Sequence, residues 1–416
     1  MDQTGHARVE QEVEAELEEQ HRVTNLELFF DLVFVFAITQ VTAFLADDLT
    51  WGGLLRGLFV LAALWWAWAA YAWLTNTLDP EEGAVRLAMF ASMGAMLIVS
   101  LATPGAFGDD GVVFGIAYFF VRALHIVLYA IAGRDDPDLE RAVLRILPSA
   151  LIGAALLVVA SFFDGAAQMA IWAVALAIDY LWLLVVGMRG WRVEAEHFVE
   201  RHGLIIIIAI GESIVAVGVG AAGEPLEAGL IAAALLAITV ACSLWWSYFD
   251  WVIYMSQATL AEATGERRAV LARDLYSYLH LPMVAGVVLF ALGVKTTLGH
   301  LEDPLDVISA VGLCGGLALY FAGHVALRLR TSGGWGHGRP VATVVLLALT
   351  PVATMVPALV ALALVVVVCV ALIAYEALRY PYARAWIRSH RGGFTMEEAR
   401  QIAPRRGRNP DAGDPA

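Results

Sequence analysis

Residues 27–39 have the sequence ELFFDLVFVFAIT, an apolar run interrupted by two acids, Glu27 and Asp31. The run continues over about 26–46, which matches the roughly 20 residues that a helix needs to cross a hydrocarbon core about 30 Å thick. The rest of the chain is similar, since 60% of its 416 residues are hydrophobic and only 16% are charged. This composition excludes an ordinary soluble protein and predicts an all-α polytopic membrane protein.

Apolar runs between charged or Gly/Pro breaks predict about twelve transmembrane helices. The first six are expected at about 26–46, 54–75, 84–103, 112–132, 142–163 and 167–188. The second six are expected at about 203–221, 228–254, 274–296, 305–328, 341–357 and 358–378. The eleventh contains Pro351, ends at Pro357 and is barely long enough to cross, so a kinked or re-entrant segment is the alternative there.

The basic residues predict the orientation of these spans. With twelve spans, all of the 26 Lys and Arg except Arg56, Lys295 and Arg122 fall on one face. Because Lys and Arg in short loops stay on the cytoplasmic side, we expect both termini in the cytoplasm.

The chain also repeats itself. The run of residues 27–39 returns as ERHGLIIIIAIGE (200–212), and LAALWWAWAAYAW (61–73) returns as ACSLWWSYFDW (241–251). Further matches in the same order are Tyr118 with Tyr320, His125 with His324, and Asp179 with Glu376. A unit of six helices predicts two parallel repeats, and chance similarity of Trp-rich apolar sequence is the alternative. The expected layout is an acidic tail (1–25), a first repeat (26–188), a connector (189–202), a second repeat (203–378) and a basic tail (379–416).

The net charge of −14 belongs partly to these tails. The first twenty residues hold seven acids and one Arg, and the segment from Arg379 onward holds eight Arg and four acids. We expect no nucleic-acid partner from this distribution. The sequence has no phosphate-cradling loop, nucleophile elbow or dinucleotide fingerprint, so we expect no cofactor and no enzymatic activity.

Acids inside the spans are the candidate functional residues, because a charge at mid-membrane costs roughly 2.5 to 3.5 kcal/mol. Glu27 and Asp31 share one helical face, where Arg22, Arg122, His125 or a bound cation could balance them. The alternative is that Glu27 caps its helix and Asp31 pairs with Arg122.

Glu212 lies near the middle of the seventh span, and the repeat places it at the depth of Thr39. Matching polar groups in both halves predict a shared central site, and a buried packing acid is the alternative. Asp179, Asp250, His280 and His324 complete the set, although each alone is more often structural. Because acids outnumber bases in the spans, the set favours protons or cations unless pairing cancels the excess.

Two further patterns have a structural and a functional interpretation. The Trp-rich runs around 65–73 and 245–251 are typical of interfacial belts, and an aromatic cation site is the alternative. The segment HFVERHG (197–203) resembles a set of metal ligands, but it lacks the HExxH order, so we expect no metal.

NLELFFDLVFVFAITQ (25–40) and HFVERHGLIIIIAIGESIVA (197–216) resemble the bacterial low temperature requirement protein A family, and the resemblance covers about 22–380. It implies a multi-pass protein of the bacterial inner membrane, in a family named for a cold-growth phenotype and without an established biochemical activity. The residues that match its motifs are Glu27, Phe30, Asp31, Glu200, Arg201, Gly203, Gly211, Glu212 and Ser213.

The leading hypothesis is a channel or secondary transporter for a small cation or a proton-coupled solute. The pathway candidates are Glu27, Asp31, Glu212, Asp250 and Asp179, with Arg122, His125 and Arg201 as charge partners. The alternative is a membrane adaptation or assembly factor, or an intramembrane enzyme. The expected partners are the lipid bilayer, the solute and a second copy of the chain.

Overall fold

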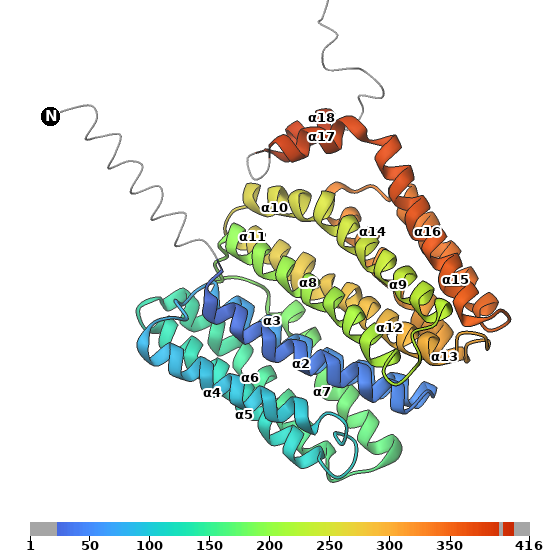
Figure 1. Cartoon of the computed structure of the whole chain (residues 1–416). Helices are drawn as coiled ribbons and strands as arrows, with labels where there is room; N and C mark the ends of the chain where they lie inside the picture. The colour runs from blue at the N-terminus through green and yellow to red at the C-terminus, as the bar shows by residue number, and fades with distance from the viewer. Residues whose placement is uncertain (1–22, 391–393, 403–416) are drawn as a thin grey trace, which may run out of the picture.

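The structure is a computed structural model of the chain, and it describes residues 23–390 and 394–402. Within these ranges every regular element is helical, and the only strand-like pairing is an isolated bridge between Pro304 and Pro357. Figure 1 shows long helices packed side by side, with two short helices across one end. The expected all-α architecture is confirmed.

Six long helices form the first half, close to the expected spans. They are α2 (Asn25–Asp47), α3 (Trp51–Thr75), α4 (Gly83–Ala102), α5 (Gly111–Ala132), α6 (Pro137–Ala160) and α7 (Gly165–Val186). The helix α6 begins five residues before the expected position. Asp136 caps it there, because its side chain accepts hydrogen bonds from two backbone N–H groups, and Pro137 suits the first turn.

The second half has more interrupted helices. Its long segments are α8 (Ala195–Gly220), α9 to α10 (Ala228–Ser247 and Ile253–Glu262), α11 to α12 (Gly265–Ala272 and His280–Gly299) and α13 to α14 (Val307–Ala310 and Gly316–Ser332). Three π-helical turns join the parts: η2 (Tyr248–Val252), η3 (Arg273–Tyr278) and η4 (Val311–Gly315). Helix α8 begins at Ala195, so residues 195–202 of the expected connector 189–202 are helical and continuous with the following span.

The last helices are α15 (Gly338–Ala353), α16 (Ala358–Arg379), α17 (Pro381–Ser389) and α18 (Met396–Ile402). In the described residues, eleven helical segments are long and apolar enough to cross a membrane, and α15 is a shorter apolar helix. Its 16 residues extend about 24 Å at the α-helical rise. The expected span 341–357 therefore exists as a helix, but it is the short one.

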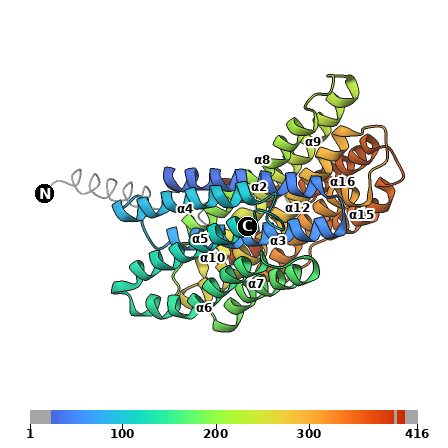
Figure 2. The ribbon, with the colours of Figure 1, turned by 90° about the horizontal axis from the view of Figure 1, so that it is seen from below.

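Helix α12 packs at the centre of the bundle. In Figure 2, α4 to α7 lie on one side and α9, α15 and α16 on the other, with α8 and α12 between them. Gly286 of α12 lies so close to α14 that an added Cβ would be 2.5 Å from the carbonyl oxygen of Gly316. Small residues allow this close approach, which excludes lipid from the centre.

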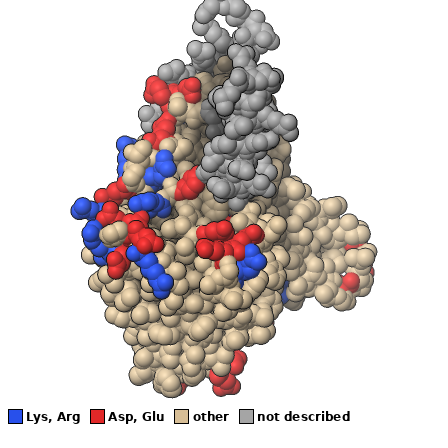
Figure 3. Space-filling model, turned by 90° about the vertical axis from the view of Figure 1, so that its left-hand side faces the viewer, with Lys and Arg blue, Asp and Glu red and all other residues tan. Residues whose placement is uncertain are grey.

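Charge on the surface agrees with a membrane location. Figure 3 shows Lys, Arg, Asp and Glu gathered over one part of the face, a broad uncharged belt below them, and a few acids at the opposite end. Large side chains such as Leu87, Val185 and Val344 are exposed, as lipid-facing residues are. The molecule has the surface of a multi-pass membrane protein.

Candidate functional site

One arginine joins helices α2 and α8. The side chain of Arg201 is completely buried, and its Nη1 atom lies 3.0 Å from Oε1 of Glu27. Its Nη2 atom donates a 2.9 Å hydrogen bond to Oδ1 of Asp31, which also accepts one from Nε1 of Trp68 at 2.9 Å. Because the two acids are one helical turn apart, a single guanidinium reaches both. Arg22, the other expected partner nearby, lies outside the described residues.

His197, one turn before Arg201, completes this cluster. Its Nε2 atom lies 3.1 Å from Oε1 of Glu27. Nδ2 of Asn76 lies 3.2 Å from Nδ1 of the histidine, while Oδ1 of Asn76 accepts a hydrogen bond from the backbone N–H of Glu194. Since the amide nitrogen can only donate, Nδ1 of His197 accepts, and the ring proton sits on Nε2, facing Glu27.

These contacts decide between the alternatives for the two acids. Glu27 does cap its helix, because its carboxylate accepts from the N–H and hydroxyl of Thr24. The alternative pairing of Asp31 with Arg122 is wrong, because Arg201 binds Asp31 and Arg122 pairs with Asp179. Sequence indicates how far along a helix a residue lies, but not which helices are neighbours. Arg201 also lies just outside the expected seventh span, 203–221.

His197, Glu200 and His202, which resembled a set of metal ligands, do not converge on one point. Oε2 of Glu200 accepts from the backbone N–H of Val23 at 3.2 Å. Nδ1 of His202 donates to the carbonyl oxygen of Phe198 at 2.8 Å. Within the described parts of the chain, no group of three or more His, Cys, Asp and Glu is arranged to hold a metal ion.

Glu212 is a separate buried acid on α8. The Thr39 hydroxyl of α2 donates a 2.6 Å hydrogen bond to its Oε2 atom. The two residues that the repeat placed at equal depth are thus in direct contact. No Lys or Arg forms an ion pair with Glu212 among the residues described here.

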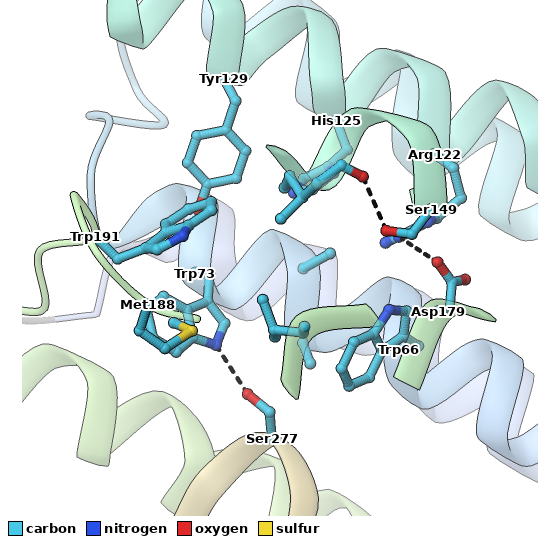
Figure 4. A pocket seen from close by; sticks show the side chains of 14 residues that line it. Trp66, Trp73, Arg122, His125, Tyr129, Ser149, Asp179, Met188, Trp191 and Ser277 are labelled. Atoms are coloured by element: carbon cyan, nitrogen blue, oxygen red, sulfur yellow. Dashed lines mark hydrogen bonds and ion pairs between the residues drawn. The ribbon is translucent and has the colours of Figure 1, made fainter. Parts of the chain in front are cut away.

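A buried ion pair lies beside a cavity in the first half. Nη2 of Arg122 on α5 donates a 3.3 Å hydrogen bond to Oδ1 of Asp179 on α7. Both residues and His125 line a cavity of about 60 Å³ (Figure 4). At about 15 Å³ for each enclosed water, it has room for roughly four waters or a small solute.

The walls of this cavity offer more donors than the protein satisfies. Nε and Nη1 of Arg122 are buried and make no hydrogen bond within the described chain. Neither ring nitrogen of His125 nor the Tyr129 hydroxyl makes a hydrogen bond of ordinary geometry there. Buried polar groups nearly always have a partner, and unpaired charged ones are the most costly. The cavity therefore suits a small ligand with acceptor atoms, above all a carboxylate or another oxyanion.

Aromatic rings form much of the remaining wall, and sequence reasoning did not assign them there. They belong to Trp66, Trp73, Tyr129 and Trp191, as Figure 4 shows. Nε1 of Trp73 donates to Oγ of Ser277 at 2.9 Å, which fixes its ring. The interfacial-belt explanation fits the exposed Trp245, whereas every aromatic residue of the first Trp-rich run is buried.

The remaining acids also have arginine partners, which the sequence did not identify. Asp250 forms an ion pair with Arg384 of α17, and Glu376 forms one with Arg339 at 2.8 Å. Arg384 lies in the expected C-terminal tail, and the sequence of a tail does not indicate whether a residue is buried against the transmembrane helices. This pairing largely cancels the excess of acids that favoured a cation.

The five expected pathway acids therefore form four groups. Glu27 and Asp31 share Arg201, Asp179 lies at the cavity, and Glu212 and Asp250 each have contacts of their own. Asp179 and Asp250 each line a void beside an ion pair with unpaired donors in the described chain. The pair of Asp179 with Arg122 is the more deeply buried of the two, so the cavity beside Asp179 ranks first. It is the best candidate for a binding site.

The fold and these buried polar groups define a polytopic helical membrane protein with an internal polar site. The model of the bacterial low temperature requirement A protein (LtrA) family matches residues 22–374, and the chain belongs to this family. It is also 30% identical over 316 residues to an uncharacterized protein of Rhizobium meliloti (strain 1021), covering 73% of this chain and 76% of that protein. No solved structure matches the chain.

Proposed function

We propose that this protein is a secondary transporter that carries a small anionic solute together with a proton, with the cavity beside Arg122 as the solute site. The observation that carries the proposal is that two nitrogens of Arg122, Nε and Nη1, have no hydrogen-bond partner in the described chain and lie at a cavity walled by aromatic rings. Guanidinium binds carboxylates and other oxyanions in a fixed geometry, and the rings suit a short apolar portion of the solute.

Charge balance supplies the coupling to protons. The Arg122–Asp179 pair is neutral as a unit and is buried on both sides. An anion that binds Arg122 draws the guanidinium away from Asp179, and a buried carboxylate without its partner is strongly unfavourable. If Asp179 takes up a proton at the same time, the site stays neutral: one anion and one proton enter together and leave together.

We place the protein in the bacterial inner membrane with both termini in the cytoplasm, because the basic loops lie on that side. We also propose two parallel six-helix repeats, 26–188 and 203–378. Equivalent tyrosines support this arrangement, since the hydroxyl of Tyr118 donates to the carbonyl oxygen of Ala63 and that of Tyr320 donates to the carbonyl oxygen of Leu244. A homo-oligomer in the bilayer is part of the proposal.

The test is solute uptake into liposomes that contain the purified protein and a pH indicator. Small carboxylates and inorganic oxyanions are added singly under an inward proton gradient. We expect uptake of at least one anion with acidification of the lumen, and loss of both signals in Arg122→Gln. Arg141→Gln is the matched control, because Arg141 is exposed and its ion pair with Asp138 lies at the surface. Absence of flux for every solute, or equal flux in Arg122→Gln, would contradict the proposal.

A non-transporting adaptation or assembly factor is the second candidate. The Arg201 cluster favours it, because a completely buried guanidinium between two acids fastens helices together. This candidate predicts that variants of the cluster lose function because the fold is destabilised, and that the protein transports no anion across the bilayer. An Arg122→Gln variant that folds normally and still supports cold growth would favour it.

A further inference from the structure

A second pocket, of about 150 Å³, lies at one end of the second half. It is lined by the C-terminal part of α14, the loop before α15, the end of α16 and the short helix α17, which Figure 1 shows across the end of the bundle. This end is the one that we propose to face the cytoplasm. The pocket is separate from the cavity beside Arg122, and it shares no lining residue with that cavity.

Three arginines and two acids line this pocket, which leaves one positive charge without a partner. Arg339 pairs with Glu376, and Arg384 pairs with Asp250. Arg328 is exposed in the pocket, and it forms no ion pair with an acid among the described residues.

Unpaired donors point to the same conclusion. Nη1 of Arg384 is buried and has no hydrogen-bond partner in the described chain, and the whole residue is only 6% exposed. Both ring nitrogens of His324, which is 1% exposed and lines the pocket, also have no partner there. A ligand that accepts several hydrogen bonds and carries negative charge would satisfy them.

The loop before α15 holds Arg328 in place. Gly336 has a φ of +69°, a conformation that favours glycine, and an added Cβ would lie 3.3 Å from the Arg328 guanidinium. The loop thus passes directly against the charged group. Trp335, next to it, is exposed and lines the pocket, so an apolar surface adjoins the basic one.

We infer that this pocket binds a phosphate group, supplied by an anionic lipid headgroup or by a free phosphate. Arginine forks match phosphate oxygens, and basic pockets between transmembrane helices on the cytoplasmic side recognise anionic headgroups. The place of α17 suits a lipid, since it directly follows α16 and buries Ile387 while Trp386 and Tyr382 remain more exposed. The inference does not depend on the proposed transport.

The test measures lipid and phosphate binding to the purified full chain in detergent. Native mass spectrometry is carried out with phosphatidylglycerol, cardiolipin or phosphatidylcholine, and thermal shift with inorganic phosphate. We expect retention of an anionic lipid over phosphatidylcholine, or stabilisation by phosphate, and at least about tenfold weaker binding in Arg328→Gln. Since Arg328 is exposed and unpaired, this variant should fold, which its unfolding temperature checks.

Arg141→Gln is the matched control, an exposed arginine outside the pocket that should leave binding unchanged. Retained lipid identifies a headgroup as the source, and stabilisation by phosphate alone identifies a free phosphate. Binding of neither, or Arg328→Gln binding as tightly as the unmodified chain, would overturn the inference.

Discussion

Arg201 and Asp31 are 170 residues apart in sequence, and their side chains meet at 2.9 Å in a buried contact between α8 and α2. The same guanidinium lies 3.0 Å from Glu27. The first and seventh long helices are thereby joined by an interaction that cannot break without leaving buried charges unpaired. In this part of the molecule Glu27, Asp31 and Arg201, which the sequence resemblance singles out, contact one another.

Replacing Arg201 by Met should be the most damaging change in this cluster. It leaves two buried carboxylates without their guanidinium, and we expect a loss of about 3 to 5 kcal/mol in the free energy of unfolding. Unfolding of the purified protein in detergent measures it. Adding Glu27→Gln and Asp31→Asn should recover much of the loss, and no recovery in the triple variant would mean that Arg201 acts in some other way.

Glu212 and Thr39 provide a finer test of the contact between the two halves. Thr39→Val keeps the shape of the side chain but removes the hydroxyl that bonds Glu212 at 2.6 Å. We expect a loss of about 1 to 3 kcal/mol, because a buried acid is left unsatisfied. Thr39→Ser keeps the hydroxyl and is the control. Equal losses in both variants would assign the effect to packing of the methyl group.

The coupling of anion and proton makes a prediction for Asp179. Asp179→Asn keeps a polar group beside Arg122 but cannot take up a proton. We expect this variant to bind the anion, since Arg122 is released, and to lose lumen acidification during uptake. Binding measured calorimetrically and flux measured in liposomes should therefore separate. Full acidification in Asp179→Asn would show that the proton travels by another group.

Close packing of α12 against α14 depends on glycine. Gly286→Val would place a side chain within 2.5 Å of the backbone of α14, and helices have to separate to accept it. We expect destabilisation of about 1 to 3 kcal/mol, as for other overpacked sites. Gly94→Val is the control, since an added Cβ there meets no atom within 4 Å. Similar stability in the two variants would show that α14 shifts freely.

Sequence predicted the helices well, because a span is a local property of about 20 apolar residues. It also identified most of the buried charged residues, since each is conspicuous in an apolar run. Individual pairings were predicted less well: Arg201 was among the expected charge partners but was not matched to Asp31, and Arg384 was not connected to Asp250. These pairings depend on which helices are neighbours, and neither depth nor spacing contains that information.

The cavity could not be foreseen for the same reason. Arg122, His125 and Asp179 were each candidates, but nothing local says that they surround a void. Trp66 and Trp73 look like interfacial residues in sequence and become cavity walls only through the packing of α3 against its neighbours. The comparison of the two halves, by contrast, aligned Thr39 with Glu212, and these two side chains are hydrogen-bonded to each other.

The short helix α15 has a consequence for the surrounding bilayer. Val341, Val344 and Leu347 are exposed along it, on a helix of 16 residues. Its length of about 24 Å falls short of a hydrocarbon core of about 30 Å, so acyl chains beside it must tilt or shorten to cover the apolar surface. The bilayer should accordingly be thinner beside α15, and lipids with shorter or more fluid acyl chains should be enriched along that edge of the protein.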